Sequence, residues 1–223
     1  MTQVLIADDH PLFRNALKLA LDACVDSVAV LEAEDLEQTR TLLTDCRDVD
    51  LLLLDLHMPG SNGLTGLAAI RCEFPEVAVV VISANEDPAV IRRALDHGAA
   101  GFIPKSSGLD VLTEAVTAVL DCKIWVPAHL HRTVASMEGG DGELAERIAR
   151  LTQQQFRVLQ MVAEGKLNKQ IADRLGIQER TVKAHMSEIF AKLEVRNRTQ
   201  AGIAFRRLEL VDPSTIKAED FSG

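Results

Sequence analysis

Short apolar runs that end abruptly in charged residues constrain the fold of this chain more than any other feature of its sequence. The run Val4 to Ala7 is followed directly by Asp8 and Asp9, and the run Leu51 to Leu54 is followed by Asp55. A continuous apolar run of this length is typical of a strand that is buried on both faces, as the strands of parallel sheets are. Because ligands bind at the carboxyl ends of such strands, the three carboxylates are expected to meet in one site.

The first 120 residues repeat this pattern of an apolar run followed by an amphipathic segment. Strands are expected over residues 4–7, 28–31, 51–54, 77–82 and 100–103. One helix is expected to begin at Pro11, and four more are expected over residues 36–43, 64–74, 88–97 and 109–120. The regular alternation of strand and helix predicts an α/β fold, with five parallel strands in a doubly wound sheet.

Charge divides the chain into two unlike parts. Residues 1–148 carry 24 acidic and 11 basic side chains, whereas residues 149–210 carry 6 acidic and 12 basic ones. The chain therefore contains a basic segment although its formal net charge is −9. A basic segment joined to an acidic one is the distribution expected when only the second part binds nucleic acid.

The cysteines and the apolar segments argue against several classes of protein. The four cysteines, Cys24, Cys46, Cys72 and Cys122, form no CxxC pair, so neither a zinc site nor a disulfide framework is expected. No apolar run approaches the roughly 20 residues that a membrane-spanning helix needs, and no secretory leader is recognised before the first strand. We therefore expect a protein of the reducing cytoplasm with no membrane partner.

Between residues 121 and 149 the alternating pattern lapses. The segment Glu138 to Glu143 is rich in glycine and acidic residues, which is typical of a flexible connection. Trp125, near the beginning of this connection, is expected to pack it against a domain rather than to stack on a base. The expected divisions are a first domain over residues 1–121, a linker over 122–148, a second domain over 149–211 and a tail over 212–223.

The second domain is expected to be a small all-α unit. Helices are predicted over residues 152–163, 169–175, 179–193 and 199–208, and Thr152 with Gln155 forms the pattern of an N-terminal capping box. Asn168 is expected to cap the second of these helices. Gly176 permits a tight turn before the third, and two helices joined by such a turn are typical of the helix-turn-helix that reads DNA.

The three carboxylates need a positive partner. Two like charges about 4 Å apart repel by roughly 4 kcal/mol at an effective dielectric near 20, and Mg²⁺ is a cation that carboxylate oxygens bind well. Backbone oxygens near His57, in the turn after Asp55, can face such an ion. Ser83 and Lys105 follow the fourth and fifth expected strands, where a hydroxyl and an ammonium can contact a phosphoryl group. A carboxylate so placed can act as a nucleophile toward a phosphodonor.

At these positions the chain resembles the receiver domain of bacterial two-component response regulators. The residues that carry the resemblance stand in the family's order over the first 120 residues or so: Asp8-Asp9, Asp55 with Met58-Pro59-Gly60, Ser83 and Pro104-Lys105. The resemblance implies that Asp55 is the phosphoacceptor. It also implies that Asp9, Asp55 and the His57 carbonyl bind Mg²⁺ directly, and that Asp8 acts mostly through water.

The same resemblance assigns the groups around the phosphoryl group. Ser83 and Lys105 are implied to contact it, and Phe102 stands at the position of the family's switch aromatic. Ser83 stands where threonine is also common, so the hydroxyl is kept. Phe102 stands where tyrosine is frequent, so a hydroxyl contact is lost, and an ordinary place in the core is the alternative interpretation of this residue.

The second domain resembles the LuxR-type output domain, and the two domains together resemble the NarL/FixJ subfamily. The resemblance lies in Leu151-Thr152 through Gly165, Asn168 to Ala172, Thr181 to His185 and Lys192-Leu193. The candidate DNA contacts are Thr181, Lys183, Ala184, His185, Ser187, Lys192, Arg196 and Arg198. Gln178 replaces the serine or threonine often found before the recognition helix, which weakens its N-cap by about 1 kcal/mol.

We expect a phosphorylation-switched transcription regulator rather than an enzyme. Its expected partners are a sensor histidine kinase, double-stranded DNA carrying an inverted repeat, and a second copy of the chain in a homodimer once it is phosphorylated. One alternative is a Mg²⁺-dependent phosphohydrolase with an aspartate nucleophile, although the haloacid dehalogenase type carries DxD where this chain has Asp8-Asp9. The other alternative is a regulator that works without phosphorylation.

Overall fold

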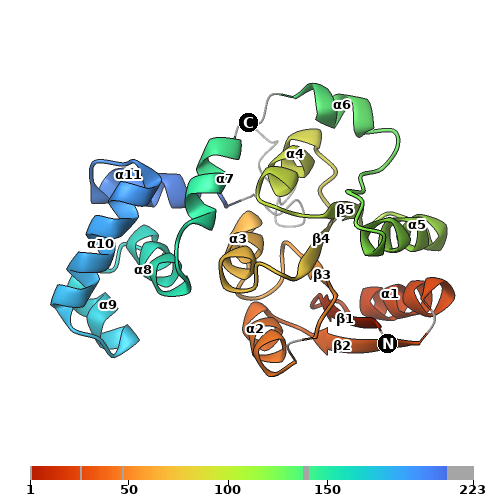
Figure 1. Cartoon of the computed structure of the whole chain (residues 1–223), viewed down its shortest axis with the longest axis horizontal. Coiled ribbons are helices and arrows are strands. Elements are labelled where there is room, and N and C mark those ends of the chain that lie inside the picture. The colour runs from red at the N-terminus through yellow and green to blue at the C-terminus, as the bar shows by residue number, and fades with distance from the viewer. Residues whose placement is uncertain (1, 26, 47, 138–140, 210–223) are drawn as a thin grey trace, which may run out of the picture.

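The computed structural model describes residues 2–25, 27–46, 48–137 and 141–209. Its first part is a parallel sheet with the strand order β2-β1-β3-β4-β5 (Figure 1). The strands are β1 (Thr2–Ala7), β2 (Val28–Ala33), β3 (Leu51–Asp55), β4 (Ala78–Ser83) and β5 (Gly101–Pro104). The helices are α1 (Pro11–Cys24), α2 (Leu36–Asp45), α3 (Leu64–Glu73), α4 (Pro88–Asp96) and α5 (Leu109–Leu120). The predicted α/β fold is confirmed, with small shifts at the element ends.

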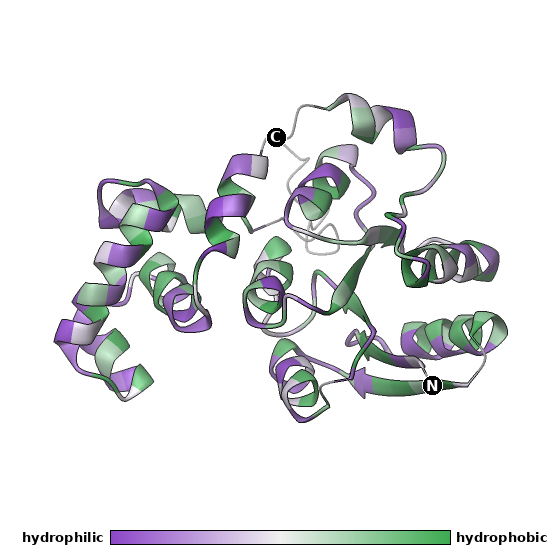
Figure 2. Cartoon of the chain, in the orientation of Figure 1, coloured by the Kyte–Doolittle hydropathy of each residue, from purple (hydrophilic) through white to green (hydrophobic). Residues whose placement is uncertain are grey.

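Helices cover both faces of the sheet, as the continuous apolar runs require. Val4 and Ile6 of β1 belong to a buried cluster that includes α1 and α5, whereas Leu5 and Ala7 belong to the cluster that includes α2, α3 and α4. Successive side chains of a strand point to opposite faces, so each strand supplies both cores. Figure 2 shows the consequence: the central strands are hydrophobic along their length, and the helices are hydrophobic on one side only.

The strand order brings the predicted carboxylates together. β1 and β3 are hydrogen-bonded neighbours, with Ala7 opposite Leu54, so Asp8 and Asp55 leave the same edge of the sheet side by side. β4 lies on the other side of β3, and Asp55 pairs with Ile82 one residue before Ser83. The carboxyl edge of the sheet is therefore the place where the functional residues expected from the sequence converge.

The second part consists of α8 (Gln153–Ala163), α9 (Asn168–Leu175), α10 (Glu179–Leu193) and α11 (Arg198–Arg206). Both hydrogen bonds of the predicted capping box join Thr152 and Gln155. Gly176 adopts a left-handed φ of 65° in the turn before α10, as predicted. The prediction for Asn168 was wrong by one residue, since it is the first residue of α9. The Gln170 side chain accepts a hydrogen bond from the backbone N–H of Leu167, which occupies the cap position instead.

The connection between the two parts is more regular than the sequence indicated. Two helices, α6 (His131–Ser136) and α7 (Gly142–Ala149), lie in it, and α7 begins inside the glycine-rich run that we expected to be flexible. α7 buries Ala145 and Ile148 against its neighbours. Trp125 is buried and its backbone pairs with β5, which confirms that it packs the connection against the first part.

Two further predictions concern segments at the limits of the description. Residues 138–140 of the glycine-rich run and the expected tail over 212–223 lie outside the described residues. Within the described residues, no helix combines the length and the apolar character that crossing a bilayer would require.

Candidate functional site

Two buried carboxylates and one ammonium form the centre of the carboxyl edge. The side chains of Asp8 and Asp55 are 0% and 2% exposed, and Lys105 reaches them from the end of β5. Lys105 Nζ lies 2.8 Å from Asp55 Oδ2 and 2.9 Å from Asp8 Oδ2. The Phe13 ring of α1 stands beside the ammonium, with its centroid 5.4 Å from Nζ. Lys105 is thus held where it balances both carboxylates at once.

Burial and charge act against each other on these groups. Burial raises the pKa of Asp55, and the hydrogen bond and charge of Lys105 oppose that rise without cancelling it. Burial would lower the pKa of Lys105, but its bonds to Asp55 and Asp8 outweigh burial and leave the pKa raised. The Lys105 ammonium is therefore charged near neutral pH.

Two residues that the sequence analysis did not select complete this edge. His10 Nδ1 lies 2.7 Å from Asp9 Oδ1, and the His10 backbone N–H donates to Asp8 Oδ1 at 2.8 Å. Arg14 of α1 is buried and donates from Nη1 to the Asp8 carbonyl at 2.7 Å. The only sequence signal for His10 is its position directly after the two acids. The spacing of four residues places Arg14 one helical turn further along.

The other predicted residues lie around this centre. The His57 backbone N–H donates to Asp55 Oδ1 at 3.2 Å, so the turn after β3 holds the Asp55 carboxylate in place. Ser83 is fully buried, and its hydroxyl accepts a hydrogen bond from Asn85 N at 3.1 Å. Phe102 is fully buried in the core cluster that includes α3 and α4. The hydroxyl, the aromatic ring and the carboxylates therefore belong to neighbouring strand ends.

The donor set fits a hard divalent cation. Oxygen or nitrogen atoms of Asp8, Asp9, His10 and Asp55 lie within 4.8 Å of one another. Asp8 Oδ2 and Asp9 Oδ1 are buried, and within the described part of the chain they accept no well-aligned hydrogen bond, although the Lys105 ammonium lies near the first and the His10 ring near the second. Lys105 pairs with both Asp8 and Asp55, and Asp9 lies beside the His10 ring, so the three carboxylates carry more negative charge than the Lys105 ammonium balances. Lone pairs of this kind, on acidic oxygens, are what Mg²⁺ binds.

The candidate DNA-contacting residues separate into two groups. Lys183, Ala184, Ser187 and Arg196 are exposed, and Thr181 and His185 are half-buried. Lys192 Nζ instead donates to the Arg150 carbonyl at 2.8 Å and to Gln155 Oε1 at 2.7 Å. Arg198 donates to the side chain of Asn168 and to the Lys166 carbonyl. The structure therefore gives Lys192 and Arg198 partners inside the helical part.

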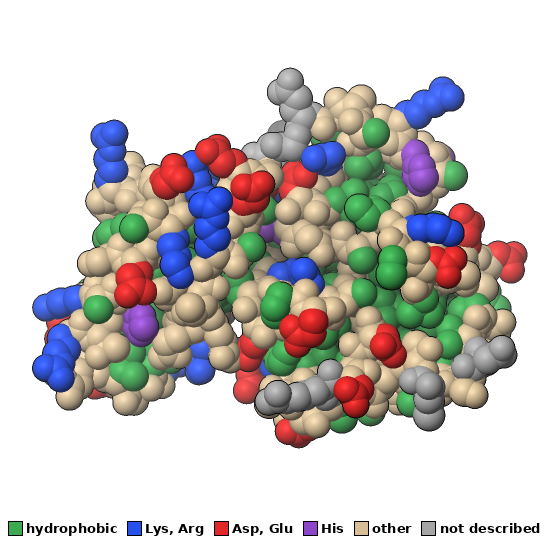
Figure 3. All heavy atoms as spheres, viewed as in Figure 1, with side chains coloured by type: hydrophobic (Ala, Val, Ile, Leu, Met, Phe, Trp, Pro, Cys, Tyr) green, Lys and Arg blue, Asp and Glu red, His purple; other side chains and the backbone are tan. Residues whose placement is uncertain are grey.

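Three members of the exposed group, Lys183, Ala184 and Ser187, lie on one side of α10, and Arg196 follows after the end of this helix. Figure 1 shows α10 with α9 at the end of the molecule farthest from the sheet, and Figure 3 shows Lys and Arg side chains along that end. Val182, Met186 and Ile189 of α10 are buried toward α8 and α9, so the opposite side is free for a partner. Gln178, at the N-cap of α10, makes no side-chain capping hydrogen bond, as expected.

Comparison with known protein families follows the same division of the chain. The model of the response regulator receiver domain matches residues 4–117, and that of the bacterial regulatory proteins of the luxR family matches residues 149–204. The chain belongs to the response regulator family. It is a two-component response regulator that carries a receiver domain and a LuxR-type DNA-binding domain, as DNA-binding transcription regulators of this family do.

Curated relatives align along nearly the whole chain. The glycerol metabolism activator of Pseudomonas putida is 42% identical over 206 residues, covering 90% of this response regulator and 93% of the relative. The nitrate/nitrite response regulator NarP of Escherichia coli is 34% identical over 203 residues, covering 91% and 94%.

Solved structures of response regulators share the fold. RcsB of Salmonella typhimurium has a TM-score of 0.56 at 28% identity, covering 91% of this chain and 96% of RcsB. An RcsB complex with DNA has a TM-score of 0.56 at 27% identity, covering 97% and 99%.

Proposed function

We propose that this response regulator accepts a phosphoryl group on Asp55. The supporting observation is the convergence of Asp8, Asp55 and Lys105 at hydrogen-bonding distance on one strand edge. In the proposed reaction an Asp55 carboxylate oxygen attacks the phosphorus of the donor, and the bond from phosphorus to the donor's leaving group breaks. Asp9, Asp55 and the His57 carbonyl would hold Mg²⁺, with Asp8 nearby. When bound, the ion neutralises the acids and the phosphoryl oxygens.

Lys105 and Ser83 are proposed to contact the transferred group. Lys105 already bridges Asp55 and Asp8, so a small movement of its ammonium brings it onto a phosphoryl oxygen. Ser83 follows Ile82, the residue of β4 that pairs with Asp55. Its hydroxyl can donate a hydrogen bond to the phosphoryl group. Phe102, on the neighbouring strand, is proposed to follow the movement of Ser83.

The phosphorylated protein is proposed to bind DNA through α10. Lys183, Ala184 and Ser187 form the exposed side of this helix, with Thr181, His185 and Arg196 beside them. A helix of this kind reads base edges near its N-terminal end, while cations further along contact phosphates. Lys192 and Arg198 donate hydrogen bonds within the helical domain, so we propose that they stabilise the domain and contribute less to DNA binding.

The proposed partners follow from the same argument. A sensor histidine kinase supplies the phosphoryl group, and a homodimer presents two copies of α10 to an inverted repeat. RcsB, a structural relative, has been seen as two dimers bound to two parallel DNAs. We assign residues 1–121 to the receiver, 122–148 to the connection and 149–211 to the output domain. Because its proposed partner is DNA, we propose that the protein acts in the cytoplasm. We also propose that it is a regulator and not an enzyme.

The experiment is incubation of the full chain with Mg²⁺ and acetyl phosphate, followed by intact mass measurement. Wild type is expected to gain the mass of one phosphoryl group, and removal of Mg²⁺ with a chelator is expected to prevent the gain. Asp55→Asn is expected to gain nothing, whereas Asp121→Asn, a change of an exposed acid far from the site, is expected to behave as wild type. A wild type that stays unmodified, or an adduct that persists in Asp55→Asn, would exclude Asp55 as the acceptor.

A further inference from the structure

His10 stands among the acidic residues of the site, with one ring nitrogen close to their oxygens. Its Nδ1 lies 2.7 Å from Asp9 Oδ1 and 3.2 Å from Asp8 Oδ1. Together with an oxygen of Asp55, these atoms all lie within 4.8 Å of one another. In the described part of the chain, no other group of three or more histidine, cysteine or acidic side chains converges in this way. The imidazole nitrogen therefore belongs to the same donor set as the carboxylates.

The backbone holds His10 in this place. The residue before a proline is restricted to extended conformations, and His10, which precedes Pro11, has φ −96° and ψ 105°. Its N–H donates to Asp8 Oδ1 at 2.8 Å, and its carbonyl accepts from the N–H groups of Phe13 and Arg14 at 3.1 Å each. Because both backbone groups are bonded, the imidazole reaches the site without any rearrangement of the chain.

A buried arginine holds the strand end from which His10 follows. The Arg14 side chain is 9% exposed and donates from Nη1 to the Asp8 carbonyl at 2.7 Å. Its other two nitrogens donate to Glu32 at 3.1 Å and to Glu34 at 2.7 Å. The segment from Asp8 to His10 is thus fixed between α1 and the end of β2. Ligands that are fixed in advance lose less conformational freedom when an ion binds.

The neighbours of His10 Nδ1 make conflicting demands on this atom. The oxygens of Asp8 and Asp9 require a hydrogen-bond donor, whereas the Lys105 ammonium, 3.5 Å away, requires an acceptor. A divalent cation removes this conflict, because the oxygens and the ring nitrogen can all direct lone pairs at it. Asp8 Oδ2, on a fully buried side chain, accepts no well-aligned hydrogen bond among the described residues and so keeps a lone pair for an ion.

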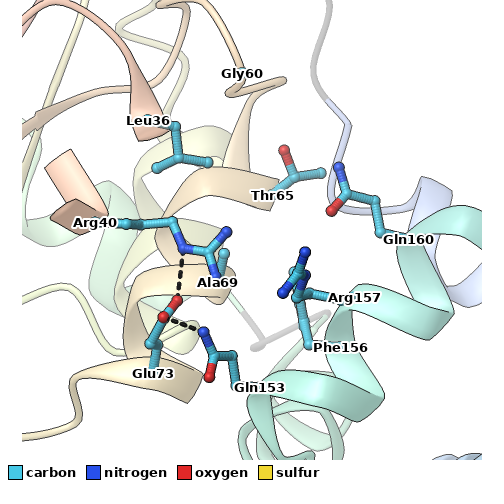
Figure 4. A pocket seen from close by; sticks show the side chains of 10 residues that line it. All are labelled: Leu36, Arg40, Gly60, Thr65, Ala69, Glu73, Gln153, Phe156, Arg157 and Gln160. Carbon is cyan, nitrogen blue, oxygen red and sulfur yellow. Dashed lines mark hydrogen bonds and ion pairs between the residues drawn. The ribbon is translucent and has the colours of Figure 1, made fainter. Parts of the chain in front are cut away.

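The cavity lined by α2, α3 and α8 differs from this site in one respect, which Figure 4 shows. Glu73 is the one carboxylate among the side chains that line it. Arg40 donates to Glu73 at 2.6 Å, and Gln153 donates to it as well. The lone pairs of Glu73 are thus used within the chain, whereas those of Asp8 and Asp9 are directed into the site.

A nitrogen ligand changes which ions a site prefers. Mg²⁺ binds oxygen and keeps several of its waters, whereas imidazole is a good ligand for divalent transition-metal ions. Two ligand atoms on opposite sides of such an ion are about 4.2 Å apart, because each bond is roughly 2.1 Å long. The separations of up to 4.8 Å within the donor set of His10 and the three acids therefore require only a small inward movement.

We propose that His10 Nδ1 is a direct ligand of the divalent cation in this site, and that it gives the receiver a preference for transition-metal ions such as Mn²⁺ and Co²⁺ over Mg²⁺, beyond that of the carboxylates alone. The inference rests on the proposed function, because it takes Asp9 and Asp55 as the other ligands. The occupant of the site is then set by the supply of transition-metal ions as well as by that of Mg²⁺.

The first experiment detects the nitrogen directly. Mn²⁺ is added to the full chain, and pulsed electron paramagnetic resonance records the coupling of its electron spin to the nuclei of its ligands. Wild type is expected to show coupling to a directly bound ¹⁴N nucleus, which changes to ¹⁵N coupling when the protein carries ¹⁵N-histidine. His10→Gln, which offers an oxygen in place of the ring nitrogen, is expected to lose this signal. Bound Mn²⁺ without histidine coupling in wild type, or no bound Mn²⁺, would overturn the proposal.

Two features make His10→Gln a clean variant. The His10 side chain is 65% exposed and does not cap α1, so the variant is expected to fold as wild type does, which urea unfolding checks. His129→Gln is the matched control, since His129 is an exposed histidine in the connection after α5. It is expected to keep the coupling, and loss of the coupling in this variant would assign the signal to a surface histidine and overturn the proposal.

The second experiment compares ions by titration calorimetry. In His10→Gln the dissociation constant for Co²⁺ is expected to rise by roughly tenfold or more relative to that for Mg²⁺. His129→Gln is expected to keep the ratio of the two constants found in wild type. If His10 only donates a hydrogen bond to Asp9, its replacement changes both constants by the same factor, and that result would overturn the proposal.

Acetyl phosphate with Mg²⁺ separates this inference from the proposed function. A phosphoryl adduct on wild type, together with missing histidine coupling to Mn²⁺, would refute His10 as a ligand and leave the proposed function standing. Histidine coupling in a wild type that gains no adduct would support His10 as a ligand and refute Asp55 as the acceptor.

Discussion

Cations on α10 that look alike in the sequence differ in what they contact. Lys183 is exposed and forms an ion pair with Glu179, one turn earlier on the same helix, at 3.3 Å. Lys192 is half-buried and bonded to Arg150 and Gln155. A surface pair along a helix contributes only about 0.3–0.5 kcal/mol, whereas hydrogen bonds from a charged donor contribute about 1.5–3 kcal/mol.

Two alanine substitutions are therefore expected to separate stability from DNA binding. Lys192→Ala is expected to lower the free energy of unfolding by roughly 1–2 kcal/mol, because Gln155 and the Arg150 carbonyl lose their donor. Lys183→Ala is expected to leave stability within about 0.5 kcal/mol and to weaken DNA binding, with a smaller dependence of affinity on salt. Urea unfolding and DNA titration at several salt concentrations measure both. Equal stability losses in the two variants would contradict this assignment.

At the residue scale the sequence predicts the charged residues at the centre of the site, but not the two residues that hold the acidic ones in position. Asp8 and Asp55 can be found because they end apolar runs, and the parallel sheet brings such ends together. Lys105 can be found by the same rule. His10 and Arg14 follow no run, and their contacts with Asp9 and the Asp8 carbonyl depend on how α1 packs on the sheet. No local pattern determines that packing.

At the element scale, α10 begins with a weak cap. Gln178 has extended backbone angles of φ −80° and ψ 148° and makes no side-chain capping bond. A serine at a position with this geometry accepts a hydrogen bond from the second or third N–H of the helix. Gln178→Ser is therefore expected to raise the stability of the protein by about 0.5–1 kcal/mol, measured by urea unfolding.

The matched control for this change is Gln178→Ala, which shortens the side chain without supplying a capping oxygen. It is expected to leave the stability close to that of wild type. A gain of the same size in both variants would mean that removing glutamine, and not capping, is responsible.

Elements with a strong local pattern are predictable in this chain, and elements formed by long-range contacts are not. The strands and α1 to α5 follow apolar periodicity. α7 does not follow from the sequence because Gly142 and its acidic neighbours indicate a flexible segment, while the helix is stabilised by burial of Ile148 and by the ion pairs of Asp141 with Arg93 and Arg207. The N-cap of α9 is Leu167 and not Asn168, because the Gln170 side chain accepts the hydrogen bond of the Leu167 N–H at the beginning of the helix.

At the scale of the whole molecule, a buried histidine at the end of α4 couples stability to pH. His97, which follows α4, is 6% exposed, and its Nε2 has no hydrogen-bond partner among the described residues. Its pKa is lowered from 6.5 to about 4, mainly by burial; the charges of Asp141 and Asp96 oppose this shift, and those of Arg93 and Arg207 add to it. The unfolded chain therefore takes up this proton at a higher pH than the folded protein does.

The stability contributed by neutral His97 is complete above pH 6.5 and is lost as the pH falls toward 4. The loss is expected to approach about 1.4 kcal/mol per pH unit within that window. In His97→Leu this part of the dependence is expected to disappear, while His129→Leu, a change of an exposed histidine, is expected to retain it. Urea unfolding at pH 7, 6, 5 and 4.5 measures the difference. Parallel curves for His97→Leu and wild type would contradict the assignment.

The central claim is that a phosphoryl group on Asp55 allows two output domains to pair on DNA. Selection of bound sequences from a pool of random duplexes, with and without acetyl phosphate and Mg²⁺, tests it directly. Phosphorylated wild type is expected to enrich inverted repeats whose half-sites lie about one helical turn apart, and Asp55→Asn is expected to enrich none. Equal enrichment by wild type and Asp55→Asn, or enrichment of single half-sites only, would contradict the account.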